Sequence, residues 1–142
     1  MNASGQGRKF IPKPDENALT RAPVAPSHLD QFAKEEWKRV MPYLVKNKIA
    51  TKIDLTGLEL YCEMISTIRK TRILMHKALA KTVKDEDDGK SVEYQKLFGV
   101  VNRATMTARS LASEYGLTPV SRARMAELTE DDDDSDNPLA VR

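Results

Sequence analysis

The chain has 142 residues, of which 31% are charged and 6% are aromatic, and its formal net charge at pH 7 is +2. That length corresponds to one ordinary domain with one hydrophobic core. No apolar run approaches the roughly 20 residues that a membrane-spanning helix needs, and the first residues lack the apolar stretch of a secretory signal. Because the only cysteine, Cys62, cannot form an internal disulfide, we expect an intracellular protein.

The small net charge hides an uneven distribution along the chain. Residues 1–128 carry 22 Lys and Arg against 15 Asp and Glu, whereas residues 129–142 carry one Arg against six acids. Blocks of like charge repel themselves and stay solvated. The sequence therefore predicts an acidic disordered tail at residues 129–142, which serves either solubility or the interaction with a partner.

The start of the chain predicts a disordered arm followed by a helix. Residues 1–26 contain four of the seven prolines and show no sustained apolar period. Order is expected to begin at Ser27, which can cap a helix over residues 28–46 whose apolar side chains recur at helical spacing. Pro42 lies inside this pattern. Because proline removes a backbone donor and clashes with the preceding turn, we expect a kink or a break near Met41.

Two long helices are predicted next. Thr51, with Asp54 three residues later, is a second start signal, and the apolar spacing that follows fits a helix of up to about 30 residues. The acidic stretch "KDEDDGK" at 84–90 predicts a solvated turn, after which Ser91 can cap a third helix. The apolar residues of this third helix alternate steps of three and four, as two facing helices require: Tyr94, Leu97, Val101, Ala104, Ala108, Leu111 and Tyr115.

The segment after the third helix predicts a definite helix end. Gly116 suits the left-handed conformation that ends helices, and Leu117 can fold back onto the last turn. Pro119 prevents the helix from continuing. Ser121 then starts one more short helix, which we expect to end near Leu128.

Together these signals predict an all-α protein. A long antiparallel helical hairpin carries the N-terminal helix packed across it and a short C-terminal helix, and the helical domain covers residues 27–128 between the arm and the tail. Several apolar residues lie off the main stripes, and they either widen the core or meet another subunit: Leu60, Met64, Ile73, Leu74, Phe98 and Val100.

Signatures of catalysis are hard to find. The two histidines, His28 and His76, have no second histidine or cysteine at metal-ligand spacing, and no glycine-rich phosphate loop occurs. Cys62 lies on an apolar face and is interpreted as a core residue. The carboxylates at 85–88 lack the spaced ligands of a calcium loop and are interpreted as a solvated turn. The sequence therefore predicts no enzyme, no metal site and no cofactor.

Basic residues are more informative. Four lysines near the end of the second helix follow steps of seven, four and three along one face, and two arginines lie beside them. Such a pattern indicates a stripe that faces phosphates, although each lysine alone is equally typical of a solvated helix face. We call these six residues the α-hairpin stripe: Arg69, Lys70, Arg72, Lys77, Lys81 and Lys84.

Three segments carry a resemblance to a known family. "EEWKRVMPYL" at 35–44, "LELYCEM" at 58–64 and "YGLTPVSRARM" at 115–125 resemble, in that order and spacing, the small subunits of phage terminases, in particular those of tailed phages and prophages. The resemblance covers about residues 27–128. It implies a protein that recognises viral DNA, assembles as a ring and hands the DNA to a large subunit holding the ATPase and the nuclease. That division of labour explains why no catalytic residues are found.

The expected function is therefore a non-enzymatic adaptor of DNA packaging in the cytoplasm of an infected or lysogenic bacterium. Its expected partners are double-stranded viral DNA, the large terminase subunit and further copies of itself, with no membrane. A structural helical oligomer of head assembly, without affinity for DNA, is the alternative. A transcriptional regulator would instead show a recognisable helix-turn-helix and form a small dimer.

The surface that contacts DNA stays open at this stage, because no compact helix-turn-helix precedes Ser27. The candidates are the basic arm (Arg8, Lys9, Lys13 and Arg21), the α-hairpin stripe, and the pair Arg122 and Arg124. In a ring, this pair lies at a subunit boundary or a channel mouth, or else it pairs with a carboxylate such as Glu114 or Glu127. The acidic tail either docks on the large subunit or folds back on the protein's own basic surface.

Overall fold

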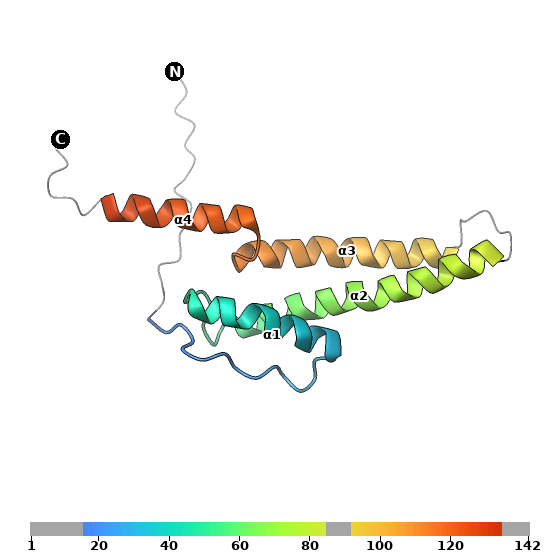
Figure 1. The fold of residues 1–142 in the computed structure, drawn as a ribbon, viewed down its shortest axis with the longest axis horizontal. Helices are drawn as coiled ribbons and strands as arrows, with labels where there is room; N and C mark the ends of the chain where they lie inside the picture. The colour runs from blue at the N-terminus through green and yellow to red at the C-terminus, as the bar shows by residue number, and fades with distance from the viewer. Residues whose placement is uncertain (1–15, 85–91, 135–142) are drawn as a thin grey trace, which may run out of the picture.

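The computed structural model describes residues 16–84 and 92–134. Over these residues the chain forms four α-helices: α1 (Gln31–Lys46), α2 (Leu55–Lys84), α3 (Val92–Glu114) and α4 (Pro119–Asp134). α2 and α3 lie side by side as a long antiparallel hairpin, α1 packs along the first half of α2, and α4 extends past the end of α3 (Figure 1). The prediction of an all-α fold built on a helical hairpin is confirmed.

The hydrophobic core lies where α1 and α3 pack on the first half of α2. Large side chains of α1, including Trp37, Met41 and Leu44, are fully buried together with Leu58 of α2. α3 contributes smaller buried side chains, which allow its axis to come close to α2: Val101, Ala104 and Ala108. The apolar spacing of the sequence therefore predicted the core faces of these three helices.

α1 begins at Gln31, later than the sequence predicted. Asp30 is the N-cap, because its carboxylate accepts a 3.0 Å hydrogen bond from the backbone N–H of Ala33. The prediction that Ser27 caps this helix is wrong. Of the kink or break expected near Met41, the break does not occur, since α1 runs through Pro42 without interruption. Pro42 is exposed, so water can reach the carbonyl group that lacks its helical donor.

The start of α2 is tied to the end of α3. The start signal predicted at Thr51 forms a turn just before α2, which begins at Leu55: the carboxylate of Asp54 accepts 2.8 Å hydrogen bonds from the N–H and the hydroxyl of Thr51. The hydroxyl of Tyr115, at the end of α3, donates a 2.6 Å hydrogen bond to the carbonyl of Asp54. The same hydroxyl occupies the space that a Cβ atom on Gly57 would need. A glycine at this position of α2 therefore lets Tyr115 close the bundle.

α3 ends as the sequence predicted. Gly116 adopts a φ of 64°, and its N–H donates a 3.3 Å hydrogen bond to the carbonyl of Ser113. The N–H of Leu117 folds back to the carbonyl of Ala112 at 2.8 Å. These two bonds form a Schellman motif, in which a glycine in the left-handed conformation satisfies the last carbonyls of the helix.

α4 begins earlier and ends later than predicted. Thr118 is the N-cap: its hydroxyl accepts a 3.2 Å hydrogen bond from the N–H of Ser121, whose own hydroxyl accepts one of 3.2 Å from the N–H of Thr118. Pro119 occupies the first helical position, where its missing N–H costs nothing. The helix continues to Asp134, past the end expected near Leu128. Among the described helices, α4 makes contacts only with α3.

The segment before α1 packs on the helical domain. The indole N–H of Trp37 donates a 2.9 Å hydrogen bond to the carbonyl of Pro23, and the N–H of Leu19 donates one of the same length to the carbonyl of Ala50. Residues 16–26, which belong to the predicted arm, thus contact α1 and the loop after it. The hairpin turn and the two ends of the chain lie outside the described residues, and with them several predicted features: Arg8, Lys9, Lys13, the carboxylates at 85–88, Gly89, Ser91 and the last part of the tail at 135–142.

The half of the hairpin that α1 does not cover exposes apolar surface. Ile73 and Leu74 on α2 are 46% and 50% exposed, and Phe98 on α3 is 48% exposed. Further apolar side chains are exposed on the same two helices: Leu60, Leu79, Val92 and Met106. The sequence had left open whether the off-stripe apolar residues widen the core, and the structure places four of the six at the surface.

Candidate nucleic-acid interface

The first part of the α-hairpin stripe is engaged in holding α1 to α2. The ammonium group of Lys70 donates a 2.5 Å hydrogen bond to the carboxylate of Asp30, and the hydroxyl of Ser66 donates one of 2.6 Å to the same group. These two donors, with the backbone N–H of Ala33, hold the pKa of Asp30 well below its usual range. Lys70 therefore has a structural partner, and its charge is largely compensated.

Arg69 is compensated in a similar way. One guanidinium nitrogen lies 3.3 Å from the carboxylate of Glu35, and the other lies 3.5 Å from that of Glu36, both on α1. Arg69 and Lys70 thus bridge two helices, and the sequence pattern alone had not separated them from the rest of the stripe.

Glu36 is the centre of a polar network that the sequence analysis missed. Its side chain is only 3% exposed, and it accepts a 2.9 Å hydrogen bond from Arg39 and a 2.7 Å hydrogen bond from the hydroxyl of Tyr61. Burial alone would raise the pKa of Glu36, but the hydrogen bonds from Arg39 and Tyr61 outweigh it and lower the pKa. Burial together with the hydrogen bond to Glu36 raises the pKa of Tyr61. The network thus keeps a buried carboxylate charged between α1 and α2.

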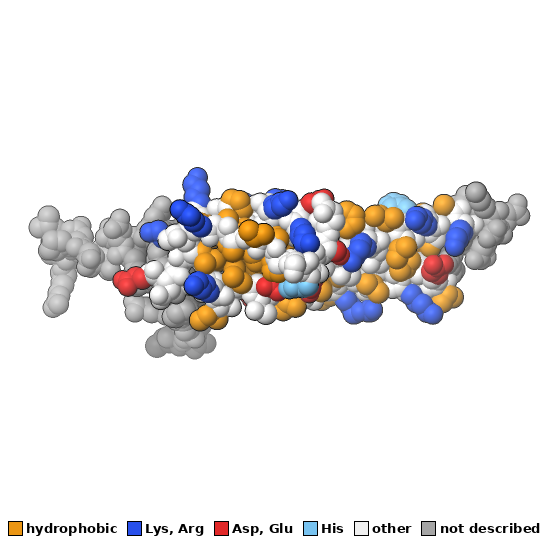
Figure 2. Space-filling view, turned by 90° about the horizontal axis from the view of Figure 1, so that it is seen from below, with side chains coloured by type: hydrophobic (Ala, Val, Ile, Leu, Met, Phe, Trp, Pro, Cys, Tyr) orange, Lys and Arg blue, Asp and Glu red, His pale blue; other side chains and the backbone are white. Residues whose placement is uncertain are grey.

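The second part of the stripe is different. Arg72, Lys77 and Lys81 are exposed, and within the described residues none of them lies at ion-pair distance from a carboxylate. They lie on the half of α2 that extends past α1. Lys84 is the last residue of α2, and its side chain lies outside the described part of the structure. Figure 2 shows that Lys and Arg side chains are spread along this face of the molecule, with fewer acidic side chains between them.

Arg122 and Arg124 lie in the first turns of α4, which starts at the end of the bundle opposite to this exposed part of the stripe (Figure 1). Both are exposed, and Arg122 donates a 3.1 Å hydrogen bond to the carbonyl of Leu117. Neither forms an ion pair with Glu114 or Glu127 in the described structure. The eight predicted site residues therefore form two separate groups rather than one site.

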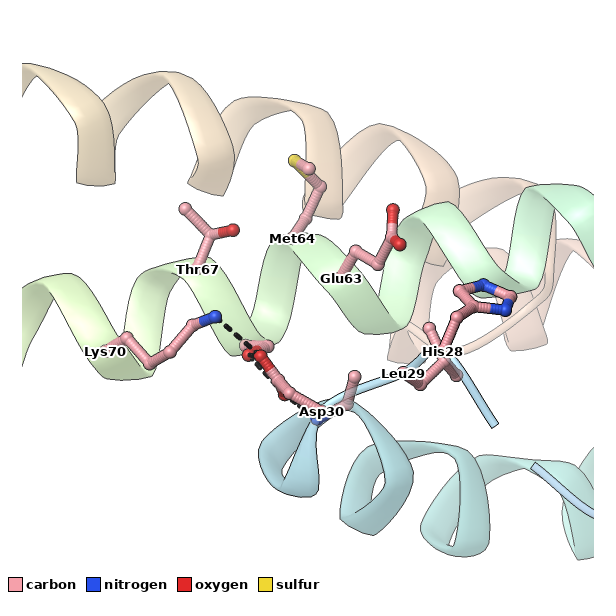
Figure 3. Close-up of a pocket in the computed structure, with 9 residues that line it drawn as sticks. His28, Leu29, Asp30, Glu63, Met64, Thr67 and Lys70 are labelled. Carbon is pink, nitrogen blue, oxygen red and sulfur yellow. Dashed lines mark hydrogen bonds and ion pairs between the residues drawn. The ribbon is translucent and has the colours of Figure 1, made fainter. Parts of the chain in front are cut away.

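A shallow hollow lies between the start of α1 and the middle of α2, with a volume of about 260 Å³. His28 and Lys70 stand near its two ends, and Asp30 lies between them (Figure 3). The imidazole of His28 lies 3.3 Å from the carboxylate of Glu59. Because Asp30, Ser66 and Lys70 in its lining are already paired with one another, we interpret the hollow as a joint between two helices.

Other functional groups are sparse in the described structure. Cys62 is buried, and burial raises the pKa of its thiol to about 12, so the reactive thiolate is suppressed. Residues 16–84 and 92–134 contain no group of three or more His, Cys, Asp or Glu side chains that could hold a metal ion. In the same part of the chain, no helix is both long and apolar enough to cross a membrane.

The described part of the chain is an elongated all-α protein, with exposed apolar side chains and with surface cations that no described carboxylate pairs. The family model described as "Phage terminase, small subunit" matches residues 33–132, which include α2, α3 and most of α1 and α4. The chain therefore belongs to the phage terminase small subunit family, and the predicted resemblance is confirmed. This membership supports a role in phage DNA packaging. No curated protein and no solved structure matches the chain.

Proposed function

We propose that this protein is the DNA-recognition adaptor of a phage terminase. It is not itself an enzyme: it assembles as a closed homo-oligomeric ring, binds double-stranded viral DNA and delivers that DNA to the large ATPase and nuclease subunit, whose activity it regulates. Small subunits of this family are generally the non-catalytic, DNA-recognising partners, and they act in the cytoplasm of the bacterial host.

The observation that carries the DNA-binding part of the proposal is the set of unpaired cations on α2. Arg72, Lys77 and Lys81 lie on the half of α2 that projects past α1. No described carboxylate lies at ion-pair distance from them. Point charges of this kind neutralise phosphates without reading bases. Few aromatic side chains accompany them, so binding is mostly electrostatic and depends on salt.

This part is tested by replacing Arg72, Lys77 and Lys81 with glutamine. Affinity for duplex DNA should fall for all sequences alike, and the slope of log K against log salt should decrease by about 3. A matched control removes three exposed cations from α3, in the variant Lys96→Gln, Arg103→Gln, Arg109→Gln. If both variants lose affinity equally, the stripe has no special role and only net charge matters.

Assembly as a ring is supported by the exposed apolar side chains on both helices of the hairpin. A large apolar patch on a soluble protein generally marks an interaction surface, and rings form when the same contact repeats around a closed axis. A purely structural oligomer of head assembly would use the same side chains, and it is the second candidate for that reason. Retention of the oligomer without any affinity for duplex DNA would favour this second candidate.

The acidic C-terminal segment, residues 129–142, is proposed to dock on the large subunit. Six acids would steer the encounter, and Leu139 and Val141 would anchor it. Deletion of this segment should leave DNA affinity unchanged while abolishing stimulation of the large subunit's ATPase. Tighter DNA binding by the deletion variant, above all at low salt, would instead show that the acids mask the basic surface.

A further inference from the structure

Four segments that are far apart in the sequence meet at the end of the bundle from which α4 projects. Residues 16–26 before α1, which we call the strap, join the loop after α1 through the 2.9 Å hydrogen bond from the N–H of Leu19 to the carbonyl of Ala50. The hydroxyl of Tyr43, near the end of α1, donates a 3.3 Å hydrogen bond to the carbonyl of Gly116, between α3 and α4. We call this region the α1–α4 junction (Figure 1).

Each of these segments brings exposed cations to the junction. Arg21 follows Thr20, which lines a hollow of about 350 Å³ together with Val45 and Lys48. Lys46 ends α1, and the other cations lie in the loop after α1 and at the start of α4. The junction cations number six, all exposed and all without an ion pair to a described carboxylate: Arg21, Lys46, Lys48, Lys52, Arg122 and Arg124.

Local structure constrains two of these cations and engages the nearest acid. Lys48 adopts a φ of 53°, and its N–H donates a 3.1 Å hydrogen bond to the carbonyl of Val45, so the chain turns sharply there. Arg122 is oriented by its hydrogen bond to the carbonyl of Leu117. The one acid in the loop after α1, Asp54, has its carboxylate engaged by Thr51. The described charge at the junction is therefore mostly positive, and two of the six cations have a locally fixed backbone or side chain.

Other acids with described side chains are few on these segments. Glu16 lines the hollow, and Glu114 and Glu127 lie on the helices on either side of Gly116. Among the described side chains of these segments, the strongly exposed large apolar ones are Val24 before α1, Ile53 in the loop after α1 and Val120 at the start of α4. A protein partner generally needs a cluster of buried apolar or aromatic anchors, whereas a phosphate backbone needs spaced cations. The composition of the junction fits the second kind of partner.

We propose that the α1–α4 junction is a second surface that contacts the phosphates of duplex DNA. It adds Lys46, Lys48, Lys52 and Arg21 to the pair Arg122 and Arg124. This inference rests on the proposed function, because it assumes that the protein binds duplex DNA. With the stripe on α2 at the other end, each subunit then contacts the duplex at two points along its length.

The experiment is a salt titration of the full-length protein with a fluorescent duplex, compared with the variant Lys46→Gln, Lys48→Asn, Lys52→Gln. Asparagine is used at position 48 because it tolerates a positive φ better than most residues. All three lysines are exposed and none has a described ion pair, so the fold should be retained. The expected result is at least a roughly tenfold loss of affinity at about 0.1 M salt, with a slope lower by about 3.

The control is again the α3 variant Lys96→Gln, Arg103→Gln, Arg109→Gln, which removes the same charge. If the wild type binds duplex DNA and the junction variant binds like this control, the second surface is refuted while the proposed function stands. If the wild type binds no duplex DNA at all, the proposed function itself fails. Loss of large-subunit binding with unchanged DNA affinity would also overturn the inference, since the junction would then serve a protein partner.

A measurement on the wild-type protein keeps the inference testable should the triple variant fold poorly. Lysine acetylation followed by mass spectrometry reports which ammonium groups are shielded. Duplex DNA should protect Lys46, Lys48 and Lys52 at least several-fold more than Lys96 on α3. Equal protection of all four lysines would refute the second surface.

Discussion

The buried carboxylate of Glu36 leads to a sharp prediction about stability. In the variant Tyr61→Phe, the 2.7 Å hydrogen bond from the Tyr61 hydroxyl to Glu36 is lost, and the apolar ring stays. A hydrogen bond to a charged group that is 97% withdrawn from water is among the stronger ones, so the free energy of unfolding should fall by about 2 kcal/mol. Arg39 still contacts the carboxylate, which keeps the loss from being larger.

Tyr43→Phe is the matched control for this prediction. Its hydroxyl also donates one hydrogen bond, but the acceptor is the neutral carbonyl of Gly116 at 3.3 Å, so the cost should be about 0.5 kcal/mol. Urea unfolding followed by circular dichroism, at one fixed protein concentration, measures both variants. A Tyr61→Phe variant that is as stable as Tyr43→Phe would refute the reasoning that the Glu36 network stabilises the contact of α1 with α2.

The same variant has a pH dependence whose sign follows from the pKa of Glu36. That pKa is lowered in the folded state, so the charged form contributes stability that is present above the unfolded pKa of about 4.3 and is lost as the pH falls below it. Tyr61 is one of the donors that lower this pKa. The difference in stability between wild type and Tyr61→Phe should therefore shrink below about pH 4.

Three further predictions concern other contacts. Gly57→Ala should destabilise the protein by about 1–3 kcal/mol despite the better helix propensity of alanine, because the new methyl group overlaps the hydroxyl of Tyr115. A second change, Tyr115→Phe, should restore part of the lost stability, whereas a Gly57→Ala variant more stable than wild type would contradict this packing. Asp30→Asn should be less stable than wild type at neutral pH, and this difference in stability should close as the pH falls below about 4, because the pKa of Asp30 is lowered in the folded state. A difference in melting temperature that does not change with pH would argue against the Lys70 contact. Leu74→Glu should reduce the mass of the oligomer in sedimentation velocity with little change in helicity, whereas an unchanged mass would remove this exposed side chain from any subunit contact.

Local signals in the sequence predicted the ends of helices well where the motif is self-contained. The stop at Gly116 needs only a residue that accepts a positive φ and a following residue that folds back, and both lie within a few positions of the helix. The interaction of Thr51 with Asp54 is equally local. Such motifs are readable because all partners are neighbours in the sequence.

Where a helix end depends on another element, the sequence was less informative. Ser27 and Asp30 are both good N-caps, and the choice between them was made by Ser66 and Lys70 on α2, which bind only Asp30. The structure resolved this ambiguity through tertiary contacts that the local pattern does not contain.

The candidate site shows the same division. The helical spacing placed Lys70 in one stripe with Lys77 and Lys81, but it could not show that Asp30 compensates only the first of them. Glu36 was overlooked because its partner Tyr61 lies on another helix. Glu36 shares the buried face of α1 with Ala33, Trp37 and Val40. That helical spacing is the signal that could have revealed a buried charge. The convergence of Arg21 and the loop lysines with Arg122 likewise follows from tertiary contacts alone.

The central claim, an oligomeric adaptor that binds DNA, is tested most directly by light scattering of the purified full-length protein with and without duplex DNA. The account predicts a closed homo-oligomer larger than a dimer at micromolar concentration. It also predicts that this oligomer elutes together with the duplex at low salt and separates from it as the salt concentration rises. A particle of monomeric mass that elutes apart from the duplex at low salt would contradict both halves of the claim.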